Sequence, residues 1–126
     1  MPGRAVIVHS LAMARAALAC GPAVLLLSAE GAAGYAGVGW WRALMRAAGA
    51  AEGTHMLDCG ALPGCVLEAL LAGQKLLVLR SEPRIFTDLS ERALDCGACL
   101  LAGPPAALDL GVRGAERLLA QWVEAK

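Results

Sequence analysis

Short, uninterrupted apolar runs constrain this chain more than any other feature. Five such runs, each of five or six residues, alternate along the chain with segments of helical period. Strands in which apolar residues do not alternate with polar ones are typical of parallel sheets that are covered on both faces. Strands that alternate with helices along the chain indicate an α/β fold. The predicted strands cover residues 4–9, 23–28, 54–58, 75–80 and 98–102.

We therefore predict one α/β domain over residues 1–126, with three layers: a five-stranded parallel sheet and helices on both faces. The predicted helices cover residues 11–20, 40–48, 65–72, 83–95 and 115–124. Repeats of about 25 residues leave room for one right-handed crossover each. They fit an open doubly wound sheet or a curved array of strand–helix units, and we expect the open sheet, in the order 2-1-3-4-5.

The charge balance narrows the range of partners. Eleven basic and eleven acidic residues give a net charge of zero, and 58% of the residues are hydrophobic. A chain without a basic excess has little with which to neutralise phosphates, so we exclude nucleic acid as the main partner. An apolar chain with no net charge has weak self-repulsion and tends to associate, which predicts a homo-oligomer, most simply a dimer.

Membrane insertion, metals and cofactors are not predicted. The longest charge-free stretch, residues 16–29, contains Gly21-Pro22 and is shorter than the roughly 20 apolar residues of a spanning helix. Five cysteines, an odd number in apolar surroundings, suit reduced thiols in the cytoplasm. Cys96 and Cys99 have the spacing of a redox or zinc pair but follow a helix instead of preceding one, so we predict no disulfide, metal or cofactor.

Polar residues gather where the predicted strands end. Ligands of open α/β sheets bind beyond the carboxyl ends of the strands, where the strand order reverses, here between strands 1 and 3. The sequence thus predicts a site for a small, possibly anionic ligand at this edge. Its candidate residues are His9, Ser10, Ser28, Glu30, Asp58, Gly60, Arg80 and Ser81.

A glycine-rich loop, residues 31–39, adds Gly34 and Tyr35 to these candidates. Glycines before a helix let backbone N–H groups approach an anion, although a tight bend explains the same residues.

Two other functions remain open from the sequence. In the first, an enzyme uses Cys59 as nucleophile and His9 as base, with an oxyanion held by N–H groups near Gly60. In the second, the protein is a self-associating interaction module without catalysis.

Overall fold

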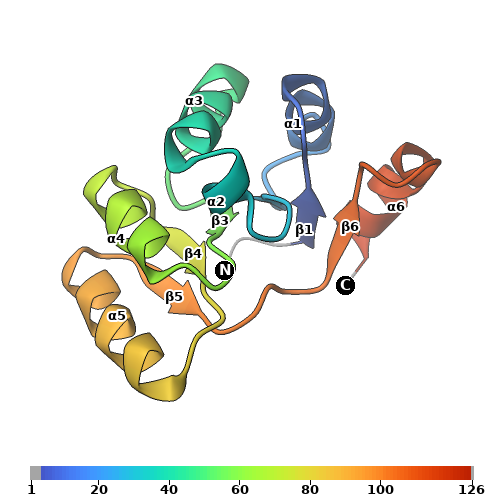
Figure 1. Ribbon diagram of the computed structural model, residues 1–126. Helices are drawn as coiled ribbons and strands as arrows, with labels where there is room; N and C mark the ends of the chain where they lie inside the picture. The colour runs from blue at the N-terminus through green and yellow to red at the C-terminus, as the bar shows by residue number, and fades with distance from the viewer. Residues whose placement is uncertain (1–3, 126) are drawn as a thin grey trace.

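A computed structural model describes residues 4–125, and within them the chain forms an α/β domain around one parallel sheet (Figure 1). The strands are β1 (Arg4–Ile7), β2 (Val24–Leu27), β3 (His55–Asp58), β4 (Leu76–Val78), β5 (Cys99–Leu101) and β6 (Ala107–Asp109). The helices are α1 (Leu11–Leu18), α2 (Ala32–Tyr35), α3 (Val38–Ala48), α4 (Pro63–Leu71), α5 (Pro83–Asp95) and α6 (Leu119–Glu124), the last preceded by a 3-10 turn, η1 (Ala115–Leu118). The predicted α/β class and parallel sheet are confirmed.

The strand order differs from the prediction. The six strands lie in the order β5-β4-β3-β2-β1-β6, and every neighbouring pair is parallel. Each crossover from β1 to β5 therefore steps to the next position in one direction. The order 2-1-3-4-5 is wrong because β2 lies between β1 and β3, so strands 1 and 3 do not enclose a crevice.

The helices lie on one side of the sheet, where the prediction had two helical layers. Right-handed crossovers that all step in one direction place their helices on the same face. The larger core cluster contains residues of every helix, whereas the smaller cluster consists of strand residues alone. Figure 1 shows the helices around the outside of an arc of strands. This is the curved strand–helix array, the second of the two arrangements the sequence allows.

The connection between β5 and β6 explains why the sheet curves. In a flat sheet these strands would be five spacings, or about 24 Å, apart. The connection has five residues, 102–106, and reaches about 20 Å when extended. It must also return along the sheet, since both strands run in the same direction. The inner face therefore folds on itself, and Ala5, Leu25, Leu27, Met56 and Val78 are at most 2% exposed without a helix over them.

Strand β6 was not predicted. It has three residues and follows Gly103-Pro104-Pro105, so its apolar run is too short to give a periodic signal. It pairs with β1 through Ala107 opposite Ala5 and Asp109 opposite Ile7, and this pairing sets the partner of His9. No helix in residues 4–125 has the length and hydropathy needed to span a bilayer.

Candidate functional site at the carboxyl edge of the sheet

Asp58 joins the loops that follow three strands. Its side chain is 2% exposed and lies at the end of β3. The Oδ1 atom accepts hydrogen bonds from the Gly31 N–H at 3.1 Å, the Gly60 N–H at 2.8 Å and Arg80 Nη1 at 3.0 Å. Oδ2 accepts from Arg80 Nη2 at 3.1 Å. The carboxylate therefore fixes the loops after β2, β3 and β4 relative to one another.

Arg80 is the cation of this edge. Its bidentate pair with Asp58 and the additional carboxylate of Glu30, 3.5 Å from Nη2, raise its pKa above the ordinary arginine value. Glu30 is 78% exposed, so it adds little to the stability of the pair. Asp58 already balances the charge of Arg80. The guanidinium is therefore held in place and is not free to bind an anionic ligand.

The two serines after β1 and β2 have structural partners. Ser28 is buried; its Oγ accepts from the Asp58 N–H at 2.9 Å and donates to the Ala29 carbonyl. Ser10 caps α1, accepting from the Met13 N–H at 3.2 Å. Ser28 thus belongs to the Asp58 cluster, whereas Ser10 does not.

His9 has a partner that the sequence did not indicate. Its Nε2 lies 2.7 Å from Asp109 Oδ1, which also accepts from the Gly111 N–H. Asp109 comes from the unpredicted β6, on the far side of β1 from β3. His9 and Asp58 thus belong to separate clusters, with β2 between their strands.

The glycine-rich loop is largely a packing element. Residues 32–35 form α2, and a Cβ on Gly34 would lie 2.6 Å from Leu62 Cδ1. Gly60 has a φ of +59°, and a Cβ there would lie 3.2 Å from the Gly31 Cα. The glycines let the loops after β2 and β3 touch. Tyr35 is 72% exposed and is available at the surface.

Cys59 is placed in the core. It is 0% exposed and belongs to the helix-side cluster. Burial, followed by the neighbouring Cys65 and Asp58, raises its pKa to about 12. A thiol in this environment stays protonated and unreactive, and His9 is bonded to Asp109. The geometry therefore gives no support to a Cys59–His9 nucleophile. The five cysteines are unpaired, and no cluster of metal-ligand side chains occurs among the described residues.

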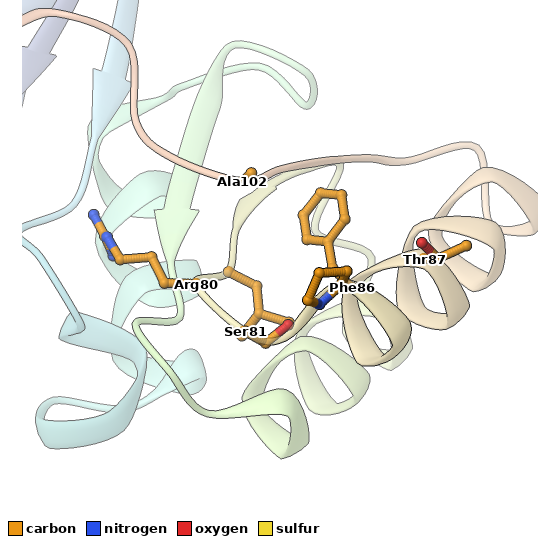
Figure 2. Close-up of a pocket in the computed structure, with 7 residues that line it drawn as sticks. Arg80, Ser81, Phe86, Thr87 and Ala102 are labelled. Atoms are coloured by element: carbon orange, nitrogen blue, oxygen red, sulfur yellow. The ribbon is translucent and has the colours of Figure 1, made fainter.

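A cleft of about 570 Å³ opens at the same edge, beyond the ends of β4 and β5. The first turn of α5 forms one wall and the chain after β5 forms another (Figure 2). In this view the Arg80 side chain points away from Phe86, and its guanidinium pairs with Asp58, which does not line the cleft. The lining residues are Leu79, Arg80, Ser81, Pro83, Phe86, Thr87 and Ala102.

Arg80 and Ser81 are the two predicted residues that line this cleft. Phe86, Thr87 and Ala102 were not predicted as site residues. The sequence does hold a signal for the first two, because the first turn of a helix that follows a parallel strand faces the carboxyl edge. Ala102 has no such signal, since its position depends on the curvature of the sheet.

Comparisons with protein-family models, with curated proteins and with solved structures find no match to this chain.

Proposed function

We propose that this protein binds a small molecule with an apolar body and one hydrogen-bond-accepting group in the cleft beyond β4 and β5. The observation that carries the proposal is the cleft itself: about 570 Å³ of space at the edge where α/β sheets bind ligands. Its size lies within the range of small-molecule sites, which are mostly apolar with a few polar groups.

The residues that line the cleft offer an apolar surface to the body of the ligand and hydrogen-bond donors to its accepting group. Leu79, Pro83, Phe86 and Ala102 offer apolar surface, and the Phe86 ring suits a flat group. The Thr87 hydroxyl can donate to an acceptor, and the Ser81 hydroxyl, which donates to the Glu82 carbonyl at 3.3 Å, can rotate to do the same. The start of α5 lacks a side-chain cap, and its N–H groups favour partial negative charge. A small carboxylic acid with an aromatic or branched body fits these features.

The test uses variants that alter the cleft and leave the core intact. Ala102 is exposed, so Ala102→Phe should fill the cleft and abolish binding of aromatic carboxylates measured by calorimetry or NMR. Ala106→Phe, an exposed position in the same connection but outside the lining, is the matched control. Ser81→Ala should weaken binding by about fivefold to tenfold through the loss of one hydrogen bond, and Ser90→Ala, farther along α5, should not.

A second candidate function, self-association, is favoured by the outer face of α4. Leu67 is 42% and Leu71 is 91% exposed, and they border a groove of about 350 Å³ with Leu70, Arg92 and Cys96. An apolar face of this kind is typical of an interface. We propose that two copies associate through it. This function is compatible with ligand binding, because the groove and the cleft have no residue in common.

We also propose that the protein works in the cytoplasm. Three of its unpaired cysteines, Cys20, Cys96 and Cys99, are exposed, and exposed thiols persist in a reducing compartment.

A further inference from the structure

A second cavity lies at the opposite, amino edge of the sheet, between the end of α3 and the turn that precedes β3. It measures about 260 Å³, and its polar lining comes from Arg42, Arg46, Glu52 and His55. His55 is the first residue of β3 and is 1% exposed. None of these residues is among the site residues that the sequence predicts.

The hydrogen bonds of His55 determine where its proton lies. Trp41 Nε1 is 3.2 Å from His55 Nδ1, and an indole N–H can only donate. The Nδ1 atom must therefore accept and carry no proton. Gln74 Nε2, 3.1 Å from the same atom, also donates to it. A neutral ring with an unprotonated Nδ1 carries its hydrogen on Nε2.

This Nε2–H has no acceptor within residues 4–125. Glu52 Oε2 is 3.9 Å away, beyond hydrogen-bond distance, and no other partner for Nε2 occurs among residues 4–125. In the same part of the chain, no fully shielded polar side-chain atom lacks a partner. Solvent therefore reaches Nε2, and the cavity that His55 lines is the route.

The charges around the cavity favour an anion. Arg42 donates to both oxygens of Glu52, at 3.0 and 2.8 Å, and to Gln74 Oε1 at 3.2 Å. Arg46 is exposed and has no ion-pair partner among the described residues. Two arginines and one glutamate thus line the cavity. The last turn of α3 contributes about half a negative charge, so the cavity keeps a net positive potential.

From this geometry we infer that the cavity binds a small oxyanion, a carboxylate or a phosphate, between the Nε2–H of His55 and the guanidinium of Arg46. Glu52, which pairs with Arg42 and places Oε2 3.9 Å from His55 Nε2, is the carboxylate nearest to this donor. Its side chain is 54% exposed and can turn outward when the oxyanion enters. The inference is independent of the ligand cleft, which lies at the other edge of the sheet.

The test titrates the full chain with inorganic phosphate and, separately, with acetate, while the ring signals of His55 are followed by NMR at constant ionic strength with chloride as the reference ion. We expect saturable shifts of the His55 signals at millimolar concentrations of at least one probe. Saturation by phosphate alone identifies phosphorylated ligands, and saturation by acetate alone identifies carboxylates.

Three surface variants sharpen the test without disturbing the core. Arg46→Ala should weaken binding about tenfold through the loss of a charged hydrogen bond, whereas Arg113→Ala, an exposed arginine outside the cavity, should leave it unchanged. Glu52→Gln should tighten binding, because a competing carboxylate is removed. The inference is overturned if neither probe gives a saturable shift of His55, or if Arg46→Ala and Arg113→Ala have equal effects.

Discussion

Asp58 accepts four hydrogen bonds through two oxygens, from two backbone N–H groups and one guanidinium. A carboxylate that is 2% exposed tolerates burial only because these donors replace water. At the scale of single residues, the carboxyl edge thus depends on one acid that the sequence did identify. The role expected of it, ligand contact, stays a prediction; its contacts within the chain are structural.

Replacing that acid tests its structural role. Asp58→Asn keeps the size of the side chain but places an N–H group against Arg80, so we expect the free energy of unfolding to fall by about 2–4 kcal/mol. Chemical denaturation at neutral pH measures the change. Glu30→Gln is the control, with a change below about 0.5 kcal/mol because Glu30 is exposed. Similar small losses for both variants would show that the Asp58 network is not essential to the edge.

His55 makes stability depend on pH. Burial lowers the pKa of His55 from 6.5 to about 4. Between these two pH values, His55 is protonated in the unfolded chain and neutral in the folded protein. The contribution of His55 to the free energy of unfolding is therefore fully present above pH 6.5 and is lost as the pH falls toward 4. In a His9→Gln background, the free energy of unfolding should fall by about 2 kcal/mol from pH 7 to pH 5. A flat profile, or a charged His55 ring in the folded protein at pH 5, would contradict this.

At the scale of elements, the sequence predicted best where the signal is local. Helix α5 has its predicted bounds, since Pro83 begins it and Gly97 follows it with a φ of +71°. Trp41 and Met45 lie four residues apart in α3, on one face of the helix, and both are buried. Helix α2 and strand β6, of four and three residues, were missed because elements this short show no periodicity.

Gly60 tests how the loop elements fit together. Its φ of +59° and the nearby Gly31 backbone leave little room for a side chain, so Gly60→Ala should lower the free energy of unfolding by about 1–3 kcal/mol. Gly39 lies inside α3 with nothing near its virtual Cβ. Gly39→Ala should therefore raise stability by about 0.5–1 kcal/mol. Thermal unfolding of both variants measures the contrast, and two changes of the same sign would refute it.

At the scale of the whole molecule, the sequence indicated an α/β sheet but not its curvature. Local patterns do not record which strand lies beside which, and the order depends on β6 pairing with β1 across about 100 residues, from Ala5 to Ala107. The proposed site differs from the expected one for the same reason. No crevice forms between strands 1 and 3, and the cleft lies beyond β4 and β5, where the long-range connection supplies one wall.

The apolar face of α4 leads to a prediction for the assembled molecule. We expect a dimer in sedimentation, with twice the 12.9 kDa mass of the chain, because Leu67 and Leu71 are exposed together. Leu71→Lys should give a monomer. Val112→Lys changes an equally apolar residue that is 60% exposed outside this face and should leave the dimer intact. A wild-type monomer at micromolar concentration would contradict the prediction.

The most direct test of ligand binding at the carboxyl edge is an amide NMR screen of small aromatic and aliphatic acids, with matched neutral compounds, against the full chain. The cleft proposal predicts that binders shift the backbone signals of Ser81, Phe86 and Ala102 together, and that Ala102→Phe removes these shifts. Binders whose shifts map elsewhere and persist in Ala102→Phe, or a screen in which no acid binds the cleft, would contradict it.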